Sequence, residues 1–383
     1  MILSSTELIY AGDNVWAAAI ELIADIQIVF PLLYGFLEIR KQYQYQTQLL
    51  GLSVLSMVVM FCLVPLASPD PFIDVFVVTN HAIDSLFSGI NPYNTEYPDI
   101  YQGALGYSPD FVYWPGLLYP MILIKKILHL DVRYTQILSI LAAILLLTGF
   151  DFSHSNSTSK QLRNSLMFLM MPIAFFVLEQ AWLDSIMFPF IVLLFEGIKC
   201  KSNAMTGLSL GYLAASRQTN LLLIILVLSY LWRHFKSRSL IKVIGYAGLM
   251  FGVLMLPFWL WDFPAFLQTT VLQVLQYRPS TDSLSWSAYL WAYHQFLLNS
   301  SLLLVLALLM SLILGYRAKT IAQLTFGTLL TYFFFFLTLK QAYCNYYYYL
   351  SFYLFLFLYY TSSKNKDISV SLSRFSTEQP KTS

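Results

Sequence analysis

Three side chains that can exchange protons lie within one short amphipathic segment of this chain. Asp74, His81 and Asp84 fall within roughly a right angle of one another at about 100° per residue, the periodicity of a helix. An apolar stripe on the other side contains Phe72, Phe76, Thr79, Ile83, Leu86 and Ile90. Such a helix can lie on a membrane surface, with its apolar side in lipid and its carboxylates and imidazole in water. The segment therefore predicts an active-site loop, in which a carboxylate or an imidazole could accept a proton.

The loop that contains this helix, residues 68–114, is acidic and has no Lys or Arg. Gly89 is expected to end the helix, and Asn91-Pro92-Tyr93 to turn the chain. A tyrosine-rich half follows, with Tyr97, Tyr101, Tyr107 and Tyr113. An ordinary interfacial loop is the alternative interpretation, with Asp74 as a helix N-terminal acid that the helix dipole favours.

The composition places this loop in a membrane protein. Of the 383 residues, 58% are hydrophobic and only 11% are charged, with a mean hydropathy of +0.63. Soluble domains have about 25% charged residues, so an integral membrane protein is predicted. Residues 1–14 carry Glu7 and Asp13 and no basic residue, so no cleavable signal peptide is expected.

The apolar segments predict an all-α polytopic protein of about 11 transmembrane helices, since a spanning helix needs about 20 apolar residues. The expected spans are 15–37, 49–67, 134–150, 165–179, 184–199, 205–217, 219–232, 241–260, 287–314, 321–338 and 341–361. The two between 205 and 232 are short, and one broken helix is the alternative there. Residues 115–128 are expected to form a partial or re-entrant helix. Residues 1–361 are predicted to form a single membrane domain, and residues 362–383 a disordered cytoplasmic tail.

Alternating these spans across a membrane separates the charges by sign. One side receives 16 of the 22 Lys and Arg residues, so that side is predicted to be cytoplasmic. The other side receives most of the acids and six basic residues: Lys125, Lys126, Arg133, Arg217, Arg278 and Lys340. Basic residues are disfavoured there, which suggests that something anionic is bound. The polar clusters that could take part in a reaction all fall on this external face. The expected location of the protein is the plasma or inner membrane.

Several motifs together resemble the GT-C superfamily of membrane glycosyltransferases, and most closely its mannosyltransferase-like branches. The motifs are Ile73-Asp74-Val75-Phe76, then Gly89-Ile90-Asn91-Pro92-Tyr93, then Tyr113-Trp114-Pro115-Gly116-Leu117. Later parts follow the same order: Gln180 and Asp184, Gly207 and Gly211 ahead of Arg217, Pro257-Phe258, and Asn345-Tyr346. The resemblance covers most of the chain from residue 49 onward. Two features depart from it: Trp114-Pro115-Gly116 replaces the more usual Tyr-Pro-Pro, and an extra helix at 15–37 precedes the first span.

The resemblance implies a GT-C-like fold and an inverting transfer. The donor would be a polyprenyl-phosphate-linked mannose or another hexose or pentose, and the acceptor a lipid or glycan hydroxyl on the external side. Asp74 matches the position of the general base, which takes the proton of the acceptor, and Asp84 and His81 are the second candidates. The leaving phosphate needs cations, and the candidates are Arg217, Arg278 and Lys340. The other expected substrate-binding residues are Glu179, Gln180, Asp184, Asn345, Tyr346 and Tyr93.

Each of these residues also has a structural interpretation. The cations can extend toward lipid headgroups, Asp184 can cap a helix, and the tyrosines can belong to an interfacial aromatic belt. No zinc, P-loop or dinucleotide pattern is present, so no cofactor and no nucleic-acid partner are predicted. A divalent metal held by the acids of the 68–114 loop stays open, as does the oligomeric state.

Two other functions stay open. A secondary transporter would also have about a dozen helices, but internal repeats and charges near the bilayer midplane are expected of it. A lipid-linked polysaccharide polymerase or ligase is expected to have its largest external loop late in the chain, whereas here it is early.

Overall fold

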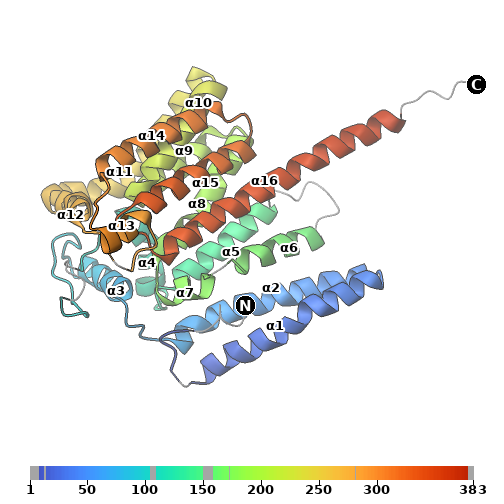
Figure 1. Cartoon of the computed structure of the whole chain (residues 1–383), viewed down its shortest axis with the longest axis horizontal. Helices are drawn as coiled ribbons and strands as arrows, with labels where there is room; N and C mark the ends of the chain where they lie inside the picture. The colour runs from blue at the N-terminus through green and yellow to red at the C-terminus, as the bar shows by residue number, and fades with distance from the viewer. Residues whose placement is uncertain are drawn as a thin grey trace, which may run out of the picture.

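The computed structural model describes residues 8–12, 14–103, 109–149, 158–171, 173–280 and 282–377, with side chains omitted at 158–161 and 362–377. Every regular element in these ranges is helical, so the all-α prediction is confirmed. Five helices are long and apolar enough to cross a membrane: α1 (Val15–Ile39), α2 (Tyr43–Ala67), the continuous stretch Ser237–Gln276, α14 (Ser300–Arg317) and α15 (Ile321–Thr338). The protein therefore has the character of a helical membrane protein (Figure 1).

The remaining elements follow, together with the three elements that make up the stretch Ser237–Gln276, which are α11, η6 and α12. They are α3 (Asp74–Phe87), η2 (Pro115–Leu117), α4 (Leu118–Ile122), η3 (Leu123–Ile127), α5 (Tyr134–Gly149), α6 (Thr158–Leu169), α7 (Ala174–Glu179), η4 (Leu183–Met187), α8 (Phe188–Lys199), α9 (Asn203–Ala214), η5 (Gln218–Asn220), α10 (Leu221–His234), α11 (Ser237–Leu267), η6 (Gln268–Leu272), α12 (Gln273–Gln276), α13 (Trp286–His294) and α16 (Cys344–Thr377). The expected partial helix at 115–128 corresponds to the short elements η2, α4 and η3.

Neighbouring helices pack in a chain of contacts that joins distant parts of the sequence. α1 packs on α2, α9 on both α8 and α11, α10 on α14, and α15 on α16. The α9–α11 contact is close because Gly211 has no side chain. A Cβ there would lie 2.3 Å from the Ala247 carbonyl oxygen. In Figure 1, α3, α12 and α13 lie at the end of the molecule where α16 begins, and the α1–α2 turn lies toward the other end.

The long helix α11 is interrupted at Asp262, whose backbone is extended (φ −159°, ψ 85°). The Asp262 side chain accepts a hydrogen bond from the Ala265 backbone N–H at 3.0 Å, so it caps the second part of the helix. Pro264 follows near the start of that second part, where a missing N–H costs nothing. The predicted span at 241–260 therefore ends where the sequence suggested, but the expected loop beyond it is partly helical.

Two predicted spans were wrong because single residues reverse the backbone inside them. The segment 287–314 divides into α13 and α14, since Gln295 is left-handed (φ 52°) and Asn299 caps α14 through the Leu302 N–H. The segment 165–179 divides into α6 and α7, with Ile173 left-handed at φ 60°. The pair at 205–217 and 219–232 forms two separate helices, α9 and α10, rather than one broken helix.

The ends of two other elements differ from expectation. The apolar stripe of α3 was expected to lie in lipid, but its middle part packs against the protein, since Thr79 and Ile83 are buried. The two ends of the stripe, Phe72 and Ile90, are exposed. Gly89, at φ 74°, follows the end of α3 as predicted. α16 continues to Thr377, past the predicted start of the tail at 362. Tyr107 and residues 378–383 lie outside the described residues.

Candidate functional site

A short backbone contact brings the 68–114 loop to the turn after α9. The Trp114 N–H donates to the Ser216 carbonyl at 3.3 Å, and the Gly116 N–H donates to the Ala215 carbonyl at 2.8 Å. The Gln218 side chain also donates to the Val112 carbonyl at 2.9 Å. This contact places Tyr113 near Arg217, although the two residues are far apart in the sequence.

Gly116 is required by this contact for two reasons. Its N–H donates a hydrogen bond to the Ala215 carbonyl, which a proline at this position could not do. There is also no room for a side chain, because a Cβ would lie 2.7 Å from the Ala215 carbonyl oxygen and 2.8 Å from the Ser216 Oγ.

Gly116→Ala is therefore expected to shift the turn that carries Arg217 and to destabilise the protein by about 1–3 kcal/mol, as overpacking does. The measurement is the unfolding midpoint of the detergent-solubilised protein. Gly248→Ala is the matched control, since a Cβ at Gly248 meets nothing within 4 Å. Equal midpoints for the two variants would show that the turn tolerates a side chain.

Arg217 belongs to a buried polar cluster built from three segments. It forms an ion pair with Asp184, which lies in η4. The Asn345 side chain, at the start of α16, donates to the other carboxylate oxygen of Asp184 at 2.6 Å. The Arg217 guanidinium carbon lies 4.5 Å from the ring centroid of Tyr346. Four residues predicted separately as substrate-binding are thus brought together, and Asp184, at 1% exposure, neutralises the cation.

Asp74 is the first residue of α3, and its carboxylate accepts the Val75 N–H at 2.8 Å. Burial raises the pKa of Asp74, and the Val75 hydrogen bond lowers it by less. No Lys or Arg in the described ranges forms an ion pair with this carboxylate. Asp74 therefore combines a position at the N-terminus of α3 with a pKa that burial raises above its ordinary value.

Tyrosines from four segments interact with Asp74. Burial is the largest cause of the raised pKa of each tyrosine, and the Asp74 charge raises that pKa further. The tyrosines are Tyr10, Tyr101, Tyr113, Tyr277 and Tyr343. For Tyr101 the pKa rises to about 12. The Arg217 charge lowers the pKa of Tyr113, so Tyr113 is near both Asp74 and the buried cluster.

The sequence did not single out Tyr10, Tyr277 or Tyr343. No local pattern marks them, because each reaches Asp74 only through folding of a remote segment. Tyr101 and Tyr113 were noted as part of the tyrosine-rich half of the loop, which was the available signal.

Asp84 is in a different situation from Asp74. Its carboxylate is half exposed and pairs with Lys126 at 2.7 Å and Lys125 at 2.9 Å. Partial burial raises its pKa, but hydrogen bonds and charges from the two lysines outweigh this and lower the pKa overall. His81 lies 3.5 Å from the Ser85 hydroxyl and packs edge-on against Tyr97. Asp84 is thus a poor base. Lys125 and Lys126 were expected to bind an external anion, but the anionic group that they contact is the Asp84 carboxylate.

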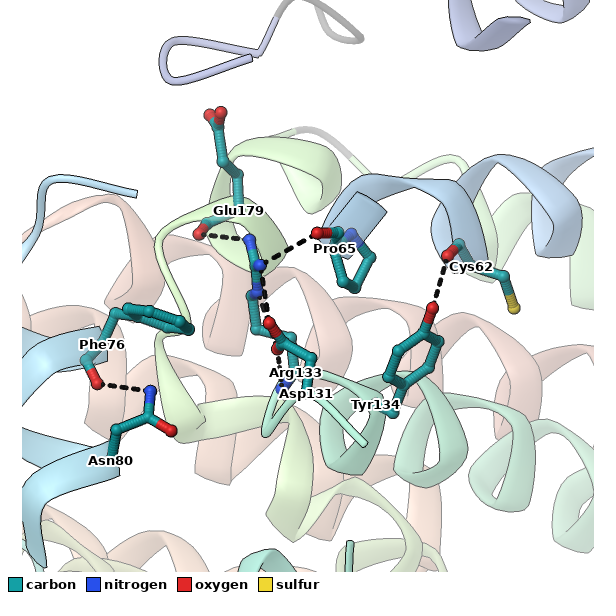
Figure 2. Close-up of polar contacts among 8 residues, drawn as sticks. All are labelled: Cys62, Pro65, Phe76, Asn80, Asp131, Arg133, Tyr134 and Glu179. Carbon is teal, nitrogen blue, oxygen red and sulfur yellow. Dashed lines mark hydrogen bonds and ion pairs between the residues drawn. The ribbon is translucent and has the colours of Figure 1, made fainter. Parts of the chain in front are cut away.

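Arg133 is likewise neutralised by the chain. Figure 2 shows its guanidinium paired with Asp131, at 2.8 Å, and donating to the main-chain carbonyls of Pro65 and Glu179. Tyr134 nearby donates to the Cys62 carbonyl at 3.0 Å. The Glu179 carboxylate points away from Arg133 in this view. It accepts the backbone N–H groups of Ile9 and Tyr10 instead.

Arg278 and Lys340 are the two predicted cations that have no acidic partner within the described ranges. Arg278 is exposed, and its carbonyl accepts the Gln341 side chain at 3.3 Å. Lys340 donates to the Leu275 carbonyl at 3.0 Å. Their two loops therefore touch, and each loop also carries a tyrosine that interacts with Asp74.

Tyr93, predicted to bind substrate, is buried and contacts other parts of the protein. It is 3% exposed, its hydroxyl donates to the Tyr113 carbonyl at 2.9 Å, and its ring packs against Phe258 and Phe266. Its own carbonyl accepts the Thr269 hydroxyl at 3.1 Å. Tyr93 thus fastens the 68–114 loop to the end of α11.

No group of three or more His, Cys, Asp or Glu side chains is placed to hold a metal ion in the part of the chain that the structure describes. Comparison with family models, curated proteins and solved structures finds no match to this chain.

Proposed function

We propose that this chain is a membrane glycosyltransferase with a GT-C-like arrangement of its membrane helices. It would transfer a sugar from a polyprenyl-phosphate donor to an acceptor hydroxyl on the external side of the cell membrane. The observation that carries the proposal is Asp74: a carboxyl with a raised pKa and no cationic partner among the described residues, surrounded by tyrosines. The resemblance of the 68–114 loop to GT-C enzymes supports the same reaction.

In the proposed reaction the acceptor oxygen attacks C1 of the donor sugar while its proton passes to Asp74. The bond between C1 and the phosphate oxygen breaks, the electron pair leaves with the polyprenyl phosphate, and the configuration at C1 inverts. In this step Asp74 has only to accept and hold the proton, and a raised pKa favours that. Asp84 cannot replace it, since two lysines lower its pKa.

The leaving phosphate needs cations that are not already neutralised. Arg217 is paired with Asp184, so we assign it to positioning Tyr346 and Tyr113 rather than to phosphate. Arg278 and Lys340 are the better phosphate ligands, because neither has an acidic partner within the described ranges. Their adjoining loops also carry Tyr277 and Tyr343, which links them to the Asp74 side of the site.

The test is a transfer assay in membranes that contain the protein. Radiolabelled sugars are supplied as polyprenyl-phosphate derivatives or as sugar nucleotides, together with extracted lipid and glycan acceptors. Transfer from a polyprenyl-phosphate sugar, and not directly from a sugar nucleotide, is the expected result. Absence of transfer from every donor, with solute uptake by proteoliposomes, would replace the proposal with a transporter.

The raised pKa of Asp74 predicts the pH dependence of transfer. Only the ionised carboxylate can accept the proton, so kcat/KM should fall as the pH drops through the Asp74 pKa. That fall should lie above the usual aspartate value of about 3.9. The profile of kcat/KM against pH is the measurement, with Asp84→Asn as the control that leaves it in place. A profile without this acidic limb would remove Asp74 from the role of base.

A further inference from the structure

Residues 8–12, here called the N-terminal strap, are fastened to α7. The backbone N–H groups of Ile9 and Tyr10 donate to the two carboxylate oxygens of Glu179, at 2.8 and 2.7 Å. Just after the strap, the Asn14 side chain donates to the Ala67 carbonyl at 2.7 Å. The strap is therefore held by α7 on one side and by the end of α2 on the other.

The Glu179 carboxylate depends on the strap for its hydrogen bonds. Glu179 is fully buried at 0% exposure, and a buried carboxylate is costly unless it is paired or hydrogen-bonded. No Lys or Arg in the described part of the chain pairs with it, because the nearby Arg133 is paired with Asp131. Figure 2 shows that Arg133 reaches only the main-chain carbonyl of Glu179. Two strap N–H groups stabilise the charge instead.

The backbone on both sides of Glu179 is unusual for the residues that occupy it. Ile173 before α7 and Ala181 just after Gln180 are both left-handed, at φ 60° and 55°. This conformation is unfavourable for a residue with a side chain, above all for a β-branched one. The surrounding contacts therefore hold α7 in one position, with Glu179 and Gln180 both presented to the strap.

The strap in turn places Tyr10 at the candidate site. The pKa of Tyr10 is raised mainly by burial and by the Glu179 charge, is lowered by the neighbouring Gln180 side chain, and is raised least by Asp74. Contacts place Glu179 on the same side, because Arg133 donates to the Glu179 carbonyl and lies 5.0 Å from the ring of Phe76, two residues after Asp74. Glu179 and Gln180, predicted to orient sugar hydroxyls, thus contact the strap. Within the strap, Tyr10 is the residue that interacts electrostatically with Asp74.

We propose that the N-terminal strap forms the acceptor side of the site, with Tyr10 as a substrate-contacting residue and Glu179 as the positioning residue that holds it there. This rests on the proposed transferase function, since the acceptor is the molecule that gives its proton to Asp74. A phenol offers an apolar face and a polar edge. A sugar ring offers the complementary C–H face and hydroxyl edge, so the acceptor is a glycan hydroxyl.

The first experiment tests the hydrogen bonds between Glu179 and the strap, here called the latch, and it does not require enzymatic activity. Hydrogen–deuterium exchange of the full chain in detergent is followed in peptides that cover residues 8–12. Glu179→Gln is expected to speed exchange of the Ile9 and Tyr10 amides about tenfold or more, the effect of losing a charge-assisted hydrogen bond. Glu196→Gln removes another fully buried carboxylate, one paired with Lys199, and should leave the strap unchanged. Unchanged exchange in Glu179→Gln overturns the latch.

The second experiment measures the role of Tyr10. Tyr10→Phe is expected to raise the KM for the glycan acceptor about tenfold, the effect of one lost hydrogen bond in a polar site, with the donor KM unchanged. Tyr134→Phe is the control, since its hydroxyl donates only to the Cys62 carbonyl. An unchanged acceptor KM in Tyr10→Phe overturns the substrate contact. If the wild type transfers no sugar, the acceptor role fails with the proposed function, while the exchange measurement still decides the latch.

Discussion

Asp74→Asn is expected to lower the rate of sugar transfer by about 10²–10⁴-fold, the usual contribution of a positioned general base. Asparagine keeps the volume and the hydrogen bond from Val75 but cannot accept the acceptor's proton. The buried carboxyl has no ion pair with any described residue, so its replacement leaves no uncompensated cation. The variant should therefore fold normally and fail only in the chemical step.

The measurement is kcat for transfer from the polyprenyl-phosphate donor, normalised to the amount of folded protein. Asp84→Asn is the matched control, because it removes a carboxylate from the same helix. That carboxylate is half exposed and bound by Lys125 and Lys126, so its loss should leave transfer within a few-fold of the wild type. Full activity in Asp74→Asn, or equal losses in both variants, would move the base to another residue.

Arg217→Gln should cost about 3–5 kcal/mol of stability, the typical effect of leaving a buried charge without its partner. Asp184 would keep only the Asn345 hydrogen bond, at 1% exposure. The change also removes the guanidinium from the face of Tyr346, 4.5 Å away, so the start of α16 loses a contact.

The midpoint of thermal unfolding in detergent, together with the yield of monodisperse protein, is the readout. The double variant Asp184→Asn/Arg217→Gln should lose clearly less than the sum of the two single variants, because no unpaired charge stays buried. Arg278→Gln controls for loss of a cation, since Arg278 is exposed and should change stability by no more than about 0.5 kcal/mol. Additive losses in the double variant would mean that Asp184 and Arg217 do not stabilise each other.

The helical membrane character of the protein, the helix that begins at Asp74 and the break near residue 261 all followed from the sequence. These features depend on composition and on local patterns: long apolar segments, a period of 3.6, and Gly89 at a helix boundary. Features that depend only on residues close together in the sequence can be predicted from a local sequence pattern. The divisions of 165–179 and 287–314 were missed because Ile173 and Gln295 adopt left-handed backbone conformations that their residue types do not favour.

Residue types also identified the candidates for chemistry, but the partners of each charge depend on contacts between remote segments. Asp74 and Asp84 look equivalent on one helix. Only packing of the helix against the segment with Lys125 and Lys126 leaves one carboxylate ion-paired and the other without a cation. In the same way Arg217 is neutralised by Asp184, and Glu179 holds the N-terminal strap. A charge interacts with whatever is nearest in space, and that neighbour is set by how the helices pack.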